Sequence, residues 1–250
     1  MPLKEHCLII GGTGGMGKQT ALFFARKGFV VSVVGQRKAF PVDAELSSFI
    51  GYFPVDITEP EPLPGILDSI VHQAGPLNHI FFFQRFRGEK GDWKKEIDIS
   101  LTATKNIIEY LSDKFSDTGE KNIIMVSSVA SEFIAQEQGL GYHVVKAGLL
   151  QLTRYYAVLL GKRRIRVNCI SPAVVLKEES RAFYRDNKNL TDLYESITPL
   201  GRMGTPEDII HLAEFLISEK ASFLTGQNIV VDGGLTLQMQ ASLCVETCIK

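Results

Sequence analysis

The segment Cys7-Leu-Ile-Ile-Gly-Gly-Thr-Gly-Gly-Met-Gly-Lys18 leads from an apolar run through a cluster of glycines into a helix-like stretch. The apolar run predicts a buried strand, and the amphipathic spacing after it predicts a helix over 18–27. Glycines at such a junction let a phosphate approach the free N–H groups of the helix N-terminus, where side chains would hold it off. The segment therefore predicts a dinucleotide-binding turn, with these contact residues: Gly11, Thr13, Gly15, Met16 and Gly17.

Two other interpretations of the glycine turn remain open. The stretch from Gly12 to Lys18 also fits G-x-x-x-x-G-K, the start of a P-loop for nucleoside triphosphates. That motif requires Ser or Thr directly after the lysine, and Gln19 stands there instead. The glycines could also serve only a tight turn. The strand before the turn and the helix after it favour the dinucleotide.

Short apolar runs alternate with amphipathic stretches along the whole chain. Runs of this kind, rich in β-branched and aromatic residues, predict strands buried on both faces at 7–10, 30–34, 51–55, 79–83, 122–127, 166–170 and 228–231. Helices are predicted over 18–27, 92–111, 142–160 and 206–217, and residues 41–64 are interpreted as connections around the third strand. The alternation predicts an α/β fold with a parallel sheet covered by helices on both faces, in a single domain over 1–250.

Composition narrows the functional class. The 250 residues are 45% hydrophobic and 22% charged, with a net charge of −1, which is typical of a globular protein and argues against nucleic acid as a partner. No run approaches the ~20 apolar residues that cross a bilayer, and the first residues do not form a signal peptide. Cys7, Cys169, Cys244 and Cys248 form no CxxC pair. We therefore expect a cytoplasmic protein with no membrane segment and no metal site.

The end of the second predicted strand indicates which dinucleotide binds. An acidic residue at this place would hydrogen-bond the ribose 2′-hydroxyl of NAD and repel a 2′-phosphate. Here the strand ends in Gly35-Gln36-Arg37-Lys38, with no carboxylate and two cations. We predict that Gln36 and Arg37 contact the cofactor and that NADP(H) is preferred over NAD(H). Alternatively, Arg37 and Lys38 belong to a solvated turn and do not contact the cofactor.

The predicted helix over 142–160 carries a pair of residues suited to proton transfer. Tyr142 and Lys146 are four residues apart and share one helix face. A free tyrosine has a pKa of ~10, and a neighbouring cation stabilises its phenolate. Such a pair can exchange a proton with a substrate oxygen while hydride arrives at carbon. Ser128, at the end of the strand over 122–127, can polarise the same oxygen, although a helix cap is its alternative role.

With these residues the chain resembles the short-chain dehydrogenase/reductase family, in its single-domain branch similar to ketoacyl reductases. The resemblance rests on the glycine turn, on Ser128 fourteen residues before Tyr142, and on three further segments: Ile165-Arg-Val-Asn-Cys-Ile-Ser-Pro172, Pro199-Leu-Gly-Arg-Met-Gly-Thr-Pro-Glu-Asp208 and Thr225-Gly-Gln-Asn-Ile-Val-Val-Asp-Gly-Gly234. It implies a Rossmann-like, doubly wound sheet of seven strands with three helices on each face. It also implies that Lys146 holds the nicotinamide ribose, that Asp56 meets the adenine with Ile57 beside it, and that Pro172 to Val175 line the nicotinamide.

The chain departs from the family pattern at several places. The threonine before the glycine turn is Ile10, the glycine after Pro172 is Ala173, and the Asn-Asn-Ala-Gly turn after the fourth strand reads Phe82-Phe-Gln-Arg85. The helical asparagine of the family's proton relay is assigned to Asp98. A buried Asp98 near Lys146 would pair with that cation or hold a proton itself, and would keep the relay working with a shifted pKa. The alternative is a carboxylate on the helix surface.

Three further segments complete the expectations. Arg85 and Arg87 frame a loop beside the expected cleft and suit an anionic or carrier-attached substrate, although a solvated loop is the alternative. Residues 175–199, polar and helix-like, are predicted to fold over the substrate as a lid, with an ordinary pair of surface helices as the alternative. Residues 235–250 run past the expected end of the fold as a C-terminal extension. The resemblance implies a homotetramer, with a homodimer as the smaller alternative.

The sequence thus predicts an NADP(H)-dependent oxidoreductase that transfers a hydride between nicotinamide and a small-molecule or carrier-attached carbonyl or alcohol, with Tyr142 as general acid/base. The catalytic residues would be Ser128, Tyr142, Lys146 and Asp98. A second hypothesis is a dinucleotide-sensing or scaffolding protein of the same fold with little turnover. This hypothesis would account for the altered turn at Gln84-Arg85 and for Asp98. The retention of serine, tyrosine and lysine together argues against it.

Overall fold

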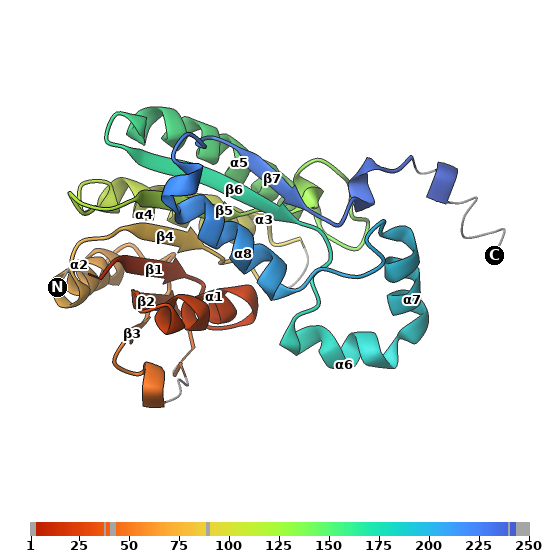
Figure 1. Cartoon of the computed structure of the whole chain (residues 1–250), viewed down its shortest axis with the longest axis horizontal. Helices are drawn as coiled ribbons and strands as arrows, with labels where there is room; N and C mark the ends of the chain where they lie inside the picture. The colour runs from red at the N-terminus through yellow and green to blue at the C-terminus, as the bar shows by residue number, and fades with distance from the viewer. Residues whose placement is uncertain (1–3, 38, 41–43, 89–90, 240, 244–250) are drawn as a thin grey trace.

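A seven-stranded parallel sheet runs through the molecule (Figure 1). The computed structural model describes residues 4–37, 39–40, 44–88, 91–239 and 241–243. The strand order is β3-β2-β1-β4-β5-β6-β7, and every neighbouring pair is parallel. The strands are β1 (His6–Ile10), β2 (Val30–Gly35), β3 (Ile50–Pro54), β4 (His79–Phe82), β5 (Lys121–Val126), β6 (Ile165–Pro172) and β7 (Asn228–Val231). The predicted Rossmann-like, doubly wound α/β fold is confirmed.

The order of the strands places a crevice between β1 and β4. The chain builds from β1 outward to β3 on one side, then returns to β4 beside β1 and builds outward to β7 on the other. In open sheets of this kind, ligands bind outside the carboxyl ends of the strands where the order reverses. Ile10 pairs with Phe82 at that point, and the Phe83 N–H donates to the Ile10 carbonyl at 2.9 Å. The glycine turn and the Gln84 segment therefore lie at this edge.

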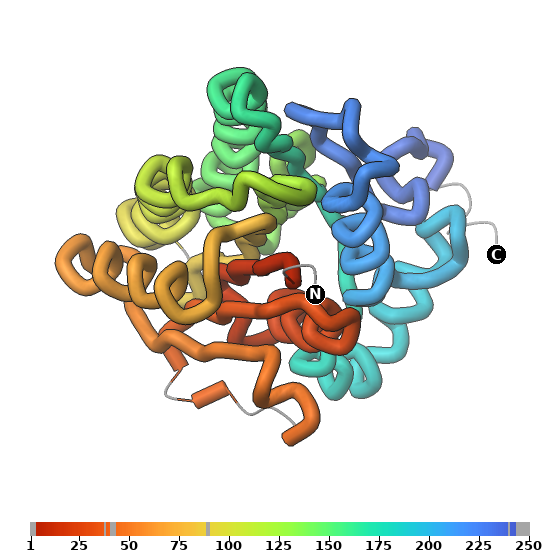
Figure 2. The backbone as a smooth tube through the Cα atoms, turned by 60° about the vertical axis from the view of Figure 1, so that its left-hand side comes forward, coloured from red at the N-terminus to blue at the C-terminus, as the bar shows by residue number. Residues whose placement is uncertain are grey.

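Two layers of helices cover the sheet, as Figure 2 shows from a second direction. One layer consists of α2 (Pro62–Ala74), α3 (Trp93–Ile97) with a π-helical turn over Asp98–Thr102, α4 (Ala103–Leu111) and α5 (Leu140–Gly161). The other consists of α1 (Gly15–Arg26) and α8 (Pro206–Ile217). Side chains alternate between the two cores along each strand: Leu8 and Ile10 pack toward the first layer, and Cys7 and Ile9 toward the second.

The expectation of three helices on each face is wrong for the face of α1 and α8. Within the described residues between β2 and β3, the chain forms the short 3-10 helix Ala44–Leu46 rather than an α-helix. Leu46 is buried in the core of this face, so this turn covers the sheet where a third helix was expected.

The helix α2 is not among the predicted ranges, and its first three residues fall within 41–64, which was interpreted as connections. It begins at Pro62, with Pro64 in its first turn. Proline is compatible with the first turn of a helix, where its fixed φ is helical and its missing N–H has no partner. Its apolar face buries Leu63, Leu67 and Ile70 against the sheet.

The predicted lid over 175–199 consists of two helices, α6 (Glu178–Asp186) and α7 (Lys188–Ile197), which project beyond the carboxyl ends of the strands (Figure 1). Both are fully described by the structure, and no residue of either is buried. A bridge between Val175 and Gly204 fixes the lid's first end. The C-terminal extension is described as far as residue 243 and holds a short 3-10 helix, Leu235–Leu237.

The remaining structural expectations concern cysteines, metals and membranes. Cys7 and Cys169 are free and buried in β1 and β6, whereas Cys244, Cys248 and Lys38 lie outside the described residues. In the part of the chain that the structure describes, no group of three His, Cys, Asp or Glu side chains could hold a metal ion. None of the described helices is long and apolar enough to span a membrane.

Candidate active site

Three adjoining cavities lie along the crevice. One of about 550 Å³ lies beside the ends of β2 and β3, a narrow one of about 80 Å³ lies at the glycine turn and α5, and one of about 720 Å³ lies under the lid. Arg85 and Arg87 line all three. Because they share these lining residues, the three cavities are treated as one cleft.

The glycine turn needs its glycines for close backbone packing. Gly11 has a φ of +77°, and a Cβ there would lie 2.5 Å from the backbone nitrogen of Gln84. A Cβ on Gly17 would lie 2.6 Å from the Gly11 carbonyl oxygen. Gly14 and Gly15 face the cleft instead. All five residues predicted for this turn line the cleft: Gly11 and Thr13 the 550 Å³ cavity, and Gly15, Met16 and Gly17 the narrow one.

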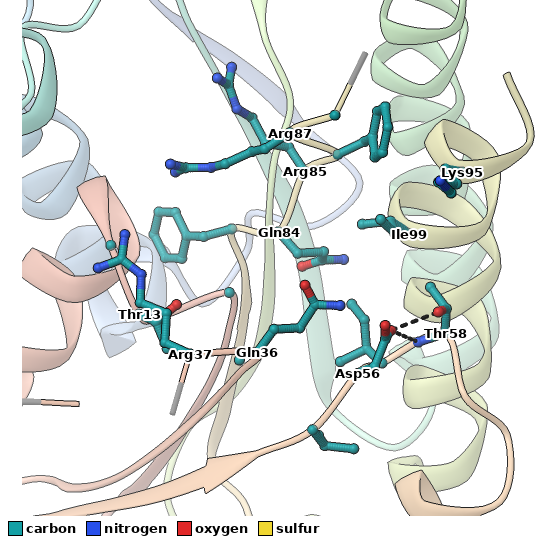
Figure 3. A pocket seen from close by; sticks show the side chains of 18 of the residues that line it. Thr13, Gln36, Arg37, Asp56, Thr58, Gln84, Arg85, Arg87, Lys95 and Ile99 are labelled. Carbon is teal, nitrogen blue, oxygen red and sulfur yellow. Dashed lines mark hydrogen bonds between the residues drawn. The ribbon is translucent and has the colours of Figure 1, made fainter. Parts of the chain in front are cut away.

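The 550 Å³ cavity is lined by the ends of β2 and β3, with Gln36, Arg37, Asp56 and Ile57 together, as expected. Figure 3 shows Arg37 rising beside Thr13, with the Gln36 and Gln84 amides turned toward each other. Asp56 accepts hydrogen bonds from Thr58, at 2.9 Å from its N–H and 2.7 Å from its hydroxyl (Figure 3). These bonds hold the loop after β3 in place at the edge of the cavity.

Ser128, Tyr142 and Lys146 line the narrow cavity together with Pro172 and Val175. Ser128 follows β5, and its hydroxyl accepts from the Ala130 N–H at 3.2 Å, so it does cap a short helix. Its own O–H is still available to donate to a ligand. Both interpretations of this serine are therefore compatible with its geometry.

The ammonium group of Lys146 is buried one helical turn from Tyr142. Its Nζ lies 5.6 Å from the centre of the Tyr142 ring and donates to the Val126 carbonyl at 3.0 Å. Burial, reinforced by the charge of Arg85, lowers the pKa of Lys146 to about 8. The folded chain therefore keeps an ammonium group beside the phenol although its burial costs free energy. A cation at this place stabilises the phenolate that a proton-transfer pair forms.

Asp98 lies away from this pair. Its carboxylate forms an ion pair with Lys94, 2.5 Å away and one turn earlier, and its side chain is 32% exposed at the edge of the 550 Å³ cavity. These contacts favour the surface-carboxylate interpretation over a pairing with Lys146.

Glu96 is the carboxylate whose charge reaches Lys146, and it was not among the predicted site residues. Its side chain packs on Gly141, where a Cβ would lie 3.1 Å from the Glu96 Cγ. Oε2 of Glu96 is buried without a hydrogen-bond partner within the described residues, and burial raises the pKa of this group against the opposing effect of Lys146. Ser100, one turn later, is also buried, and its Oγ has no partner among the same residues.

Positive charge is concentrated in the cleft of a chain whose net charge is −1. Arg85, Arg87 and Lys177 lie near one another, and burial together with their mutual repulsion lowers the pKa of Arg87 and of Lys177. Arg37 and Lys146 line the same cleft. Cations outnumber acidic side chains in the lining of the cleft, so it is suited to a phosphorylated ligand.

Comparisons with known proteins agree with this geometry. The family model described as enoyl-(acyl carrier protein) reductase matches residues 11–236. The chain belongs to the short-chain dehydrogenase/reductase family. It is 27% identical over 246 residues to the 3-oxoacyl-(acyl-carrier-protein) reductase FabG of Thermotoga maritima, covering 92% of this chain and 97% of that protein. It is 29% identical to the cyclohexanol dehydrogenase of an Acinetobacter species, covering 93% and 95%.

Solved structures of the family superpose on nearly the whole chain. A short-chain dehydrogenase/reductase from Mycobacterium ulcerans has a TM-score of 0.82 at 26% identity and covers 99% of this chain and 96% of its own. A 4-hydroxyisoleucine dehydrogenase complexed with NADH has a TM-score of 0.84 at 26% identity, with coverage of 94% and 100%. The protein is therefore an oxidoreductase of a family that uses nicotinamide dinucleotides, and the P-loop interpretation of the glycine turn is wrong.

Proposed function

We propose that this protein is an NADP(H)-dependent oxidoreductase that interconverts a carbonyl and an alcohol, within one domain, with Tyr142 as general acid/base. The observation that supports it most is that Ser128, Tyr142 and Lys146 line one narrow cavity at the glycine turn. The residues present fit a dinucleotide: Gly14 and Gly15 leave the narrow cavity free of side chains at the turn, and Arg85, Arg87 and Lys177 line it. Gly15 to Gly17 would hold its diphosphate, with Asp56 and Ile57 at its adenosine end.

In the proposed mechanism the chain's residues act on the substrate oxygen. The bound nicotinamide supplies or accepts the hydride. The Ser128 hydroxyl donates a hydrogen bond to the carbonyl oxygen and fixes its position. Tyr142 gives that oxygen a proton in reduction and removes it in oxidation. Lys146, cationic below about pH 8, stabilises the phenolate that forms.

The test of this proposal combines binding and turnover. Purified protein is titrated with NADPH and NADH, then mixed with ketones and 3-oxoacyl thioesters while absorbance at 340 nm is followed. Oxidation of the dinucleotide that depends on the ketone supports the enzyme. Binding without oxidation by any substrate would favour the alternative, a dinucleotide sensor of the same fold.

Arg37 supports the preference for NADP(H). Its guanidinium lies beside the glycine turn, and its NH2 atom is 3.0 Å from the position of a Cβ on Gly14. We predict that Arg37→Ala weakens NADPH binding about 10- to 100-fold, since a hydrogen bond to a charged group contributes ~1.5–3 kcal/mol. NADH, which lacks the 2′-phosphate, should lose less than about twofold. Isothermal titration calorimetry measures both, and an equal loss for the two dinucleotides would contradict the preference.

The substrate proposed for the 720 Å³ cavity is a carbonyl compound with an anionic or carrier-attached group. The cavity combines apolar and aromatic side chains with Arg85, Arg87 and Lys177. The Thermotoga relative is by name a reductase of carrier-attached 3-oxoacyl groups. An apolar cavity with cations at one side suits a chain that ends in a charge.

Replacing Arg85 or Arg87 by alanine tests the substrate class. If the guanidinium binds a distant anionic group equally in ground and transition states, KM should rise about 10-fold with kcat nearly unchanged. A neutral ketone such as cyclohexanone is the control and should keep its KM. Steady-state kinetics of both variants decides this, and an unaltered KM for the anionic substrate would remove the proposal.

We further propose a cytoplasmic homotetramer, or at least a homodimer. Large apolar side chains are exposed on the outer face of α5 and beside β7: Tyr155, Val158, Leu159, Val230 and Leu237. Apolar surface of this kind usually marks a contact with another subunit. Light scattering gives the number of subunits.

A further inference from the structure

A carboxylate of the lid lies on the glycine turn. Glu179, in the first turn of α6, accepts a hydrogen bond from the Gly15 N–H at 2.5 Å. The same oxygen lies 3.1 Å from the position of a Cβ on Gly14. The two residues are 164 positions apart in the chain, so the contact joins the lid to the N-terminus of α1.

This carboxylate accepts a hydrogen bond from the Gly15 N–H, which is the group that a phosphate of the dinucleotide would also need. The free N–H groups at a helix N-terminus favour an anion, and one oxygen acceptor excludes another from the same N–H. Although burial opposes its ionisation, the N–H groups of Glu179 itself and Gly15, with the charges of Arg87 and Lys177, hold the pKa of Glu179 below its usual value. The group is therefore an anion at neutral pH.

The lid is otherwise loosely attached between two fixed ends. Its first end is held by Leu176 and Gly204, whose backbones hydrogen-bond at 2.8 Å, and its last by Gln238, which donates to the Ile197 carbonyl at 2.7 Å. Between them, neither helix buries a residue. Within the described part of the chain, the bond from Gly15 is the one side-chain hydrogen bond that joins α6 to the body of the domain. Segments with little buried surface open at low free energy.

We propose that Glu179 is a latch that holds the lid over the glycine turn, and that the diphosphate of the dinucleotide must displace this carboxylate to bind. The inference rests on the proposed dinucleotide-dependent function and describes how the same site is regulated. Arg87, which lies outside the lid, also lines the narrow cavity at the turn, so a cation is available to the diphosphate once Glu179 leaves. Binding of the dinucleotide would thus free the lid from the turn, and access to the 720 Å³ cavity would follow cofactor binding.

The first experiment compares Glu179→Ala with Glu178→Ala. Glu178 is the matched control because it lies in the same turn with the same charge, but its carboxylate is 72% exposed and pairs with Arg181 at 3.2 Å. If the latched form holds about nine molecules in ten, removing the latch should lower the NADPH Kd about 10-fold. Glu178→Ala changes the net charge by the same amount but removes only an exposed ion pair, so its NADPH Kd should stay within about twofold of the parent value.

The second experiment needs no dinucleotide. The lid carries exposed sites for trypsin at Arg181, Arg185 and Lys188. Without its latch the lid should open more often, so Glu179→Ala should be cut there several times faster than the parent and Glu178→Ala. Equal cleavage rates for the three proteins would overturn the latch.

The outcomes separate the latch from the proposed function. An NADPH Kd that Glu179→Ala leaves unchanged would overturn the latch while dinucleotide binding stands. A weaker affinity would also overturn it, since Glu179 would then be a ligand of the cofactor rather than its competitor. If no dinucleotide binds either protein, the proposed function fails, and the trypsin rates alone decide whether Glu179 holds the lid.

Discussion

Replacing Tyr142 by phenylalanine is expected to lower kcat about 1000-fold, within the ~10²–10⁴-fold range of general acid–base catalysis. The substitution removes the hydroxyl proton and keeps the ring that lies 5.6 Å from the Lys146 Nζ. The affinity for NADPH should change little, because the glycine turn and the cations around it are untouched. Steady-state rates at 340 nm and a dinucleotide titration measure the two effects.

Two observations make this substitution a clean test. Within the described residues the Tyr142 side chain is half-buried, and no hydrogen bond of its hydroxyl to another residue is present, so Tyr142→Phe should unfold at the temperature of the parent. Tyr155→Phe, on the exposed side of the same helix, is the control and should keep full activity. A Tyr142→Phe protein that turns over at the parent rate would eliminate the proposed mechanism.

The local features of the fold could be predicted because their signals lie within a few residues. The five inner strands are apolar runs buried on both faces, whereas no residue of the edge strands β3 and β7 is buried. The bounds predicted for the strand over 228–231 and the helix over 206–217 coincide with β7 and α8. The glycine turn is likewise local, since its glycines precede the helix that they serve. The resemblance then supplied the doubly wound arrangement of seven strands, which periodicity alone does not give.

The carboxylate behind Lys146 could not be predicted from helical spacing. The expected helix over 92–111 is interrupted by the π-helical turn Asp98–Thr102, which adds a residue to one turn and rotates the following face. Glu96, in the last turn before this interruption, packs on Gly141 of α5, and Ser100 is buried within it, whereas Asp98 pairs with the exposed Lys94. The family motif pointed to Asp98, two residues from Glu96, and a role of Asp98 in a proton relay stays a prediction.

The latch contact is a second case in which sequence carries no signal. Glu179 sits in a polar stretch that has several other acidic residues nearby, and nothing in its neighbours distinguishes it from Glu178. Its position on Gly15 depends on how the lid returns across the carboxyl ends of the strands. Contacts of that kind are set by tertiary packing and become visible only in the folded chain.

Replacing Lys146 by methionine is expected to lower kcat about 100- to 1000-fold, because the phenolate of Tyr142 loses the cation that stabilises it. In the parent, activity that requires this cation should be full below about pH 8 and fall as pH rises through that value. The methionine variant should lose this descending limb. Lys162→Met, at the exposed end of α5, is the control and should keep the parent profile.

The same substitution should stabilise the fold, and this separates a catalytic lysine from a structural one. Burial lowers the pKa of Lys146 from 10.5 to about 8, so between those values the unfolded chain binds a proton that the folded chain has released. The parent must therefore gain stability as pH rises from about 8 to 10.5, and below pH 8 it carries the full cost of a buried cation. Methionine has a similar volume and no charge, so at pH 7 the variant should need more urea to unfold than the parent. It should also show no gain of stability between pH 8 and 10.

An enzyme that is more stable and nearly inactive indicates that the buried cation is kept for proton transfer. Loss of stability together with activity would mean that Lys146 mainly holds β5 to α5 through the Val126 carbonyl.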